Sequence, residues 1–157
     1  GSTRHANFTF FIPRVRLWTS ASDSGWVSGE AMRLILRDDL ATTSVSVTYG
    51  GRSIDVPDVV VDTGSATTLL SSDYLAQIGI VPDPHDVLYA VRGVGGSEIV
   101  FARQVDELRI GEKAVPDFEV EVGGMDYGFT INGILGMDFL LCTGAVIDLR
   151  NLELTFF

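Results

Sequence analysis

One short segment of the chain joins an acidic side chain to the backbone freedom that a catalytic loop needs. The tetrapeptide Asp62-Thr63-Gly64-Ser65 directly follows three valines, residues 59–61. Such an apolar run predicts a buried strand, and a carboxylate at its end is partly withdrawn from water. Gly64 permits a tight turn, and the hydroxyls of Thr63 and Ser65 can donate hydrogen bonds that fix the loop. The pattern indicates a carboxylate held for acid–base chemistry, although the same residues also fit an ordinary turn that begins at an aspartate.

The segments around this tetrapeptide alternate apolar and polar residues, as strands do. The alternation predicts hairpins over 45–56, 89–101 and 105–122, with turns or tips at Gly50-Gly51, Gly93 to Gly96 and Gly111-Glu112. Short helices are predicted over 72–78, capped by Ser71 or Ser72 and ended by Gly79, and over 137–141. Strands are expected again over 145–147 and 152–156. The expected fold class is all-β with one or two short helices.

A faint internal repeat supports two similar halves. Val56-Pro57-Asp58 and Val115-Pro116-Asp117 each follow a glycine turn, and each precedes a strand, a glycine-containing loop and a short helix. The order of elements favours a pseudo-twofold arrangement. The second half carries Asn132-Gly133 where the first half has its acidic loop, so one chain supplies one such carboxylate.

Bulk composition excludes several classes of protein. The 157 residues carry a formal charge of −10, which leaves no basic stripe for a nucleic-acid backbone. No apolar run reaches the roughly 20 residues that a membrane-spanning helix needs. Cys142 is the only cysteine, so no intrachain disulfide forms, and the composition fits either a reducing compartment or an exported bacterial protein. We expect Cys142 to be a buried small apolar side chain, and no metal site is predicted.

Two regions are expected along the chain: an N-terminal extension over residues 1–30 and a catalytic domain over residues 31–157. Gly1-Ser2 has the look of a cloning remnant. The chain is therefore expected to be a soluble domain, of the kind excised from a longer membrane-anchored or exported protein, and its compartment is left unknown.

Three motifs in a fixed order resemble the retropepsins, the aspartic proteases of retroviruses and their bacterial and eukaryotic relatives. They are residues 59–65 with 67–70, the glycine-rich residues 91–96, and Ile134-Leu135-Gly136 followed by Met137 to Leu140. Residues 148–156 are also similar to the terminal strand that family members interleave at their dimer interface. The resemblance covers about residues 34–157.

This resemblance implies a closed β-barrel protomer with a flap hairpin, active as a homodimer in which two copies of Asp62 activate a water between them. Thr63, Gly64 and Ser65 would complete the active-site loop, with Thr63 bonding across the dimer. Val94, Gly95 and Gly96 would form the flap over an extended polypeptide substrate, and Ile134, Leu135 and Gly136 would support the substrate cleft. The reaction needs no cofactor and no covalent intermediate.

Two residues depart from the retroviral pattern. Met137 stands where retroviral members usually carry an arginine that supports the dimer, so the interface must be held differently. Ser65 stands where they usually have alanine, and its hydroxyl could stabilise the ionised acid pair and lower the optimal pH. The alternative function is a non-catalytic dimerisation or peptide-binding module with the same fold.

Overall fold

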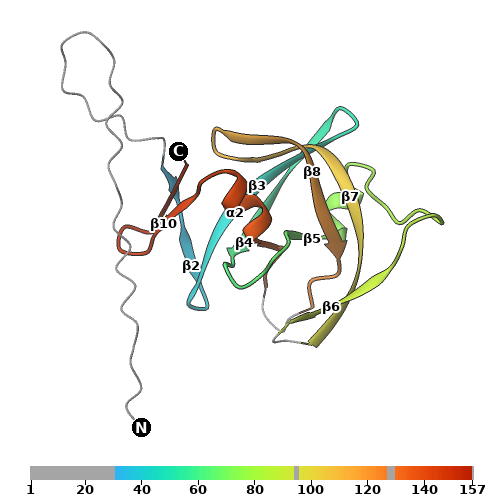
Figure 1. The fold of residues 1–157 in the computed structure, drawn as a ribbon, viewed down its shortest axis with the longest axis horizontal. Coiled ribbons are helices and arrows are strands. Elements are labelled where there is room, and N and C mark those ends of the chain that lie inside the picture. The colour runs from blue at the N-terminus through green and yellow to red at the C-terminus, as the bar shows by residue number, and fades with distance from the viewer. Residues whose placement is uncertain (1–30, 94–95, 127–129, 157) are drawn as a thin grey trace.

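The computed structural model describes residues 31–93, 96–126 and 130–156 (Figure 1). Strands dominate it, and two short helices complete it, so the predicted all-β class is confirmed. The strands are β1 (Met32–Arg33), β2 (Ile35–Arg37), β3 (Leu40–Tyr49), β4 (Arg52–Val61), β5 (Leu69–Ser71), β6 (Tyr89–Gly93), β7 (Gly96–Ile110), β8 (Lys113–Gly123), β9 (Gly133–Leu135), β10 (Val146–Asp148) and β11 (Glu153–Thr155). The helices are α1 (Ser72–Ala76) and α2 (Met137–Cys142).

Eight strands form one sheet in the order β2-β3-β4-β9-β5-β8-β7-β6. A further pairing joins β3 to β7, so six strands, β3-β4-β9-β5-β8-β7, form a closed ring of pairings. Alternate side chains of these strands fill one core, among them Val45, Val56, Leu70, Val122 and Leu135, all fully buried. Burial of these side chains on one face is the reason that the period of two is so clear in the sequence.

The internal repeat corresponds to two similar hairpins, β3–β4 and β7–β8. In both copies of Val-Pro-Asp the aspartate adopts a positive φ, 55° at Asp58 and 50° at Asp117. Asp tolerates this left-handed conformation better than most residues because its short polar side chain can bond locally. The tripeptide therefore places the same irregularity in the returning strand of each hairpin.

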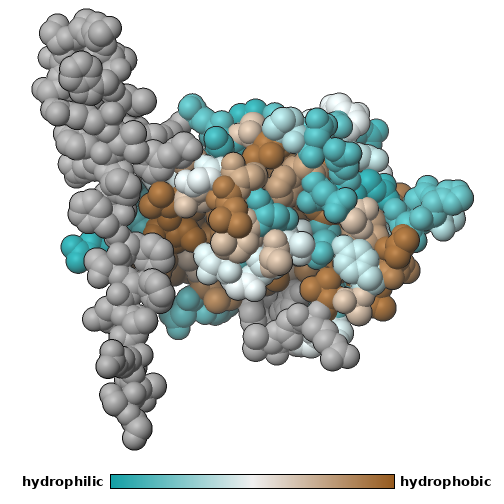
Figure 2. Space-filling model, viewed as in Figure 1, coloured by the Kyte–Doolittle hydropathy of each residue, from teal (hydrophilic) through white to brown (hydrophobic). Residues whose placement is uncertain are grey.

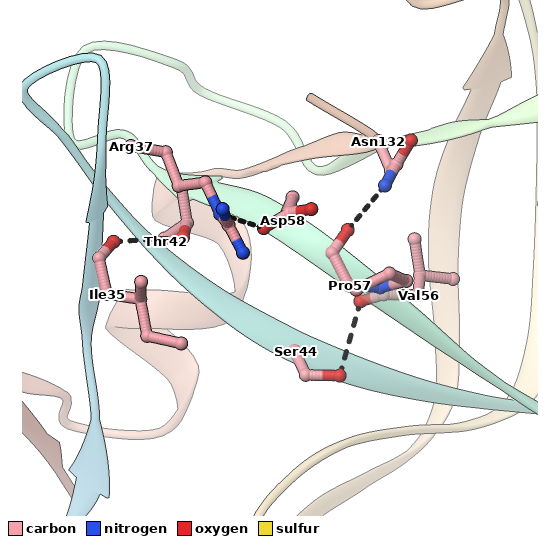
Figure 3. Close-up of polar contacts among 8 residues, drawn as sticks. All are labelled: Ile35, Arg37, Thr42, Ser44, Val56, Pro57, Asp58 and Asn132. Carbon is pink, nitrogen blue, oxygen red and sulfur yellow. Dashed lines mark hydrogen bonds and ion pairs between the residues drawn. The ribbon is translucent and has the colours of Figure 1, made fainter. Parts of the chain in front are cut away.

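Polar contacts around the first of these irregularities fasten three strands together (Figure 3). Arg37 on β2 forms a 2.8 Å ion pair with Asp58, and Thr42 on β3 donates to the carbonyl of Ile35 at 2.9 Å. The side-chain amide of Asn132, just before β9, donates to the carbonyl of Pro57 at 2.9 Å. β4 is thus held on both sides before it reaches the valines that precede Asp62.

A separate three-stranded sheet has the order β1-β11-β10. β11 pairs with β1 through Met32 and Leu154, and with β10 through Ile147 and the same Leu154. Both edges of β11 are therefore occupied within one chain. Within this sheet only the outer edges of β1 and β10 remain open, so a partner strand interleaved with residues 148–156, as the resemblance implies, would have to pair there.

The predicted N-terminal extension, residues 1–30, lies outside the described residues. Within the described part of the chain, neither helix has the length and apolarity to cross a bilayer.

Candidate active site

Asp62 lies where β4 ends against the parallel strand β9. The valines of β4 pair with Gly133, Ile134 and Leu135, and the Asp62 N–H continues this pairing by donating to the Leu135 carbonyl at 3.0 Å. Asp62 is half-buried. The structure shows the motif at the end of a buried strand, as expected.

A tight turn follows the carboxylate. The Gly64 N–H donates to Asp62 Oδ1 at 2.8 Å, and the Ser65 N–H donates to the Asp62 carbonyl at 3.2 Å. A Cβ on Gly64 would lie 3.1 Å from Asp62 Oδ1, closer than nearly all real contacts. Gly64 and Thr63 are exposed, so the loop presents its outer side at the protomer surface.

The Ser65 hydroxyl fixes the loop rather than the carboxylate. It donates to the Thr67 carbonyl at 2.7 Å, so its one proton is used there and not at Asp62. The carbonyls of Ser65 and Ala66 accept the N–H groups of Met137 and Asp138, which begin α2, at 2.8 and 3.1 Å. Loop carbonyls thereby satisfy N–H groups that the first turn of a helix leaves free.

A buried network, made by Thr68, Asp138 and Gly136 and here called the Thr68–Asp138 network, locks the same junction. Asp138 accepts the Thr68 N–H at 2.9 Å and the Thr68 hydroxyl at 2.7 Å. The Thr68 Oγ1 in turn accepts the Gly136 N–H at 3.1 Å, and Thr68 is fully buried. The sequence indicated only that Asp138 suits the start of a helix, and its partner 70 residues earlier carried no signal of its own.

Gly136 has a steric role at this junction. A Cβ there would lie 2.3 Å from the Thr67 carbonyl oxygen, which no side chain can tolerate. Leu135 is fully buried in the core, whereas Ile134 is half-buried and points to the opposite face of the sheet. Of the three residues expected to support the cleft, Ile134 is therefore the one that can face a substrate.

The expected flap corresponds to the hairpin of β6 and the first part of β7, here called the flap hairpin. Its last pair is Gly93 with Gly96, and Gly96 has a φ of 127°, which favours glycine. Val94 and Gly95, the other two residues expected at the tip, lie outside the described residues.

Two further expectations concern α2. Cys142 lies at the end of the helix and is exposed, which corrects its predicted burial. Its thiol donates to the Phe139 carbonyl at 3.3 Å. Desolvation and the nearby Asp138 raise the pKa of the Cys142 thiol, so it is not an activated nucleophile. Met137, at the position of the missing arginine, is half-buried against the core.

A second polar feature, at Glu121 on β8, was not predicted from the sequence. This side chain is only 9% exposed, and its Oε1 accepts a hydrogen bond from the Tyr89 hydroxyl at 3.1 Å. Burial and the carboxylates of Glu121 and Glu119 raise the pKa of Tyr89 to about 12. Because Glu121 occurs in an alternating strand, nothing in the sequence distinguishes it from the solvent-facing glutamates beside it.

Comparisons with known proteins agree with this arrangement. Residues 45–139 match the family described as aspartyl protease. The fold matches a crystal structure of a retropepsin-like aspartic protease from Rickettsia conorii, with 20% identity, a TM-score of 0.58, and coverage of 82% of this chain and 98% of that one. No curated protein matches the chain. Among the described residues, no group of three or more His, Cys, Asp or Glu side chains is placed to hold a metal ion.

Proposed function

Since the chain belongs to the aspartyl protease family and has a retropepsin-like fold, we propose that it is an endopeptidase whose catalytic carboxylate is Asp62. The observation that carries this proposal is the Asp62 loop itself. The loop is held by backbone bonds to Leu135, Met137 and Asp138, so the carboxylate has a fixed position at the protomer surface.

Hydrolysis requires two such carboxylates. Close like charges cannot both ionise, so a pair shares one proton, and its members divide the roles of acid and base. The ionised member takes a proton from a water, the water oxygen attacks the peptide carbonyl, and the other member protonates that carbonyl oxygen. A proton then passes to the leaving nitrogen as the C–N bond breaks. One other Asp-Ser-Gly occurs in the sequence, Asp23-Ser24-Gly25, but it follows Ser20-Ala21-Ser22 instead of an apolar strand and lies outside the described residues. We therefore assign the second carboxylate to Asp62 of another copy in a twofold homodimer.

Exposed features of the protomer surface support the homodimer. Thr63 and Gly64 are exposed on the loop, and two large apolar side chains, Leu141 at the end of α2 and Leu149 after β10, are 70% and 66% exposed. Apolar surface appears on the side of the molecule where β2 and β10 lie (Figure 2). Contacts of this kind would replace the ion pair that Met137 cannot form.

An extended polypeptide is the substrate that suits this site. The flap hairpin ends in glycines, whose backbone groups can approach another backbone closely, and such contacts read a peptide as an added strand. The peptide would lie between the flap hairpin and the two Asp62 loops.

Incubation of the protein with an unfolded polypeptide across pH 3–8 tests the proposal. We expect wild-type protein to cleave it, and Asp62→Asn to lose at least about a hundredfold in rate because the acid–base pair is gone. Asp73→Asn is the matched control, since Asp73 is an exposed carboxylate on α1 and its loss should leave the rate unchanged. Equal cleavage by wild-type and Asp62→Asn protein would disprove the assignment. Binding without cleavage by wild-type dimer would favour the non-catalytic module instead.

A further inference from the structure

Two buried side-chain polar atoms in the described part of the chain have no hydrogen-bond partner, Thr43 Oγ1 and Glu121 Oε2, and only the second belongs to a carboxylate. The Glu121 carboxylate is more than nine-tenths buried, and while Oε1 accepts the Tyr89 hydroxyl, Oε2 has no hydrogen-bond partner among the described residues. A buried carboxylate oxygen without a donor is costly, because it has lost water and gained nothing in exchange. The nearest arginine along β7, Arg103, is engaged elsewhere by a 2.7 Å ion pair with Asp86.

Strand register places Glu121 on the same face of the sheet as Asp62. Paired residues share a face, and the row runs from Val60 on β4 through Ile134 and Leu69 to Glu121. Asp62 lies two positions beyond Val60 and so shares its side. We call this the Asp62 face. Val60 and Leu69 are buried but do not belong to the main core, which lies on the other face.

Glu121 is also tied directly to the active-site junction. Its N–H donates at 2.9 Å to the carbonyl of Thr68, the residue that anchors the Thr68–Asp138 network. Three strand spacings of about 4.8 Å separate β8 from β4. A peptide bound along the Asp62 face would therefore pass Glu121 within about four residues of the scissile bond.

The flap hairpin covers this carboxylate and adds to its negative charge. Tyr89 begins β6, at the end of the flap hairpin away from the Gly93–Gly96 pair, and its hydroxyl donates to Glu121. Glu98 on β7 is half-buried, and its Oε1 lies 3.1 Å from the position of a Cβ on Gly124, next to the end of β8. Two carboxylates, Glu98 and Glu121, therefore lie on the same face of the paired strands β7 and β8.

We propose that Glu121 forms a subsite for a lysine or arginine side chain of the polypeptide substrate. This inference rests on the proposed function, and it names a substrate class for the same site. An ammonium or guanidinium group would donate to Oε2 and neutralise the buried charge, whereas a neutral side chain of equal length would leave that oxygen unpaired. Because Glu121 is already buried on β8, the preference for lysine or arginine does not require β8 to change conformation.

Cleavage of matched peptides tests the subsite. A sequence cut by the wild-type protein is resynthesised with lysine or norleucine at each of the four positions on either side of the scissile bond. We expect the lysine peptide to exceed its norleucine twin in kcat/KM by about 10- to 100-fold at one position, as one charged hydrogen bond allows. In Glu121→Gln, which removes the charge but keeps a polar group, the ratio should fall to about one, and in Glu121→Met, which removes both, it should fall below one. Glu112→Gln makes the same charge change in the exposed β7–β8 turn and should keep the wild-type ratio.

Binding to Asp62→Asn protein gives a second readout that does not depend on cleavage. Fluorescence anisotropy with the same peptide pairs should show tighter binding of the lysine peptide, and adding Glu121→Gln should abolish the difference. Absence of cleavage by wild-type protein would defeat the proposed function, and the same binding comparison, made with lysine and norleucine variants of a segment of the unfolded test polypeptide, would still decide the subsite. No lysine preference, no binding of any peptide, or a preference that survives in both Glu121 variants would overturn the inference.

Discussion

At the scale of single residues, the site depends on buried polar groups that have partners. Thr68 is fully buried, and both its N–H and its hydroxyl donate to Asp138. A donor that loses its acceptor in such a place costs about 1–3 kcal/mol, more than the bond contributes when it is intact. Asp138 therefore stabilises the segment after the Asp62 loop as well as the start of α2.

Asp138→Ala should lower the free energy of unfolding by about 2–4 kcal/mol, because two buried donors of Thr68 lose their acceptor. Asp138→Asn keeps one acceptor oxygen and gains a donor for Thr68 Oγ1, so its loss should be clearly smaller. Urea unfolding at one fixed protein concentration measures both, with Asp73→Ala as the exposed control. Equal losses for alanine and asparagine would show that the network does not work through these bonds.

Tyr89 should report on Glu121 through its ionisation. Its pKa is raised to about 12 by burial and by the carboxylates nearby, so the associated stabilisation is present below pH 10 and is lost as pH rises through about 12. In Glu121→Gln we expect the pKa to fall but to stay above its ordinary value, because burial persists. Absorbance titration identifies the curve by its absence in Tyr89→Phe. An unchanged pKa would mean that Glu121 does not contribute.

Only some of the important residues could be identified from the sequence. Asp62 and Gly64 stand out because a carboxylate and a glycine after a valine run form a local pattern. Thr68 and Glu121 do not stand out, because their roles depend on strands that are adjacent only in the folded chain. Burial decides their importance, and no local pattern encodes the burial of one polar residue in an alternating strand.

At the scale of elements, the hairpins and the short strands β10 and β11 were predictable, but the short strand β5 was not. The turns at Gly50-Gly51 and Gly111 fixed the two long hairpins, and both have the positive φ that glycine favours. α1 begins after Ser71 as expected, but no Ser71 side-chain hydrogen bond caps it. β5 has three residues and pairs with β8 and β9, which lie far along the chain, so periodicity could not reveal it. β7 is one strand of 15 residues that serves both hairpins, where the pattern suggested two.

The contact between α2 and the Asp62 loop gives a prediction at this scale. Gly136→Ala should destabilise the protein by about 1–3 kcal/mol or more, because its Cβ would lie 2.3 Å from the backbone oxygen of Thr67 and the loop must shift. Gly124→Ala is the matched control, since its nearest neighbour is the flexible end of Glu98 at 3.1 Å. Thermal unfolding compares the two. Similar small effects would show that the loop and helix can separate without strain.

At the scale of the whole molecule, the proposed activity belongs to a pair of chains. If wild-type and Asp62→Asn protomers exchange freely at equal amounts, only about a quarter of the dimers hold two intact carboxylates. We expect activity per wild-type chain to fall to about half on such mixing, and to stay constant when an inert protein is added instead. Activity that does not change on mixing, after exchange has been shown, would place the whole reaction in one protomer.

The position of β11 between β1 and β10 has a consequence for the order in which the protein assembles. The first described strand pairs with the last, Met32 with Leu154, so the three-stranded sheet cannot form until β11 has been synthesised. A nascent chain on the ribosome would already contain Asp62 and the flap hairpin but would lack this sheet. The strands that position Asp62, β4 and β9, are thus complete along the chain before the three-stranded sheet can close.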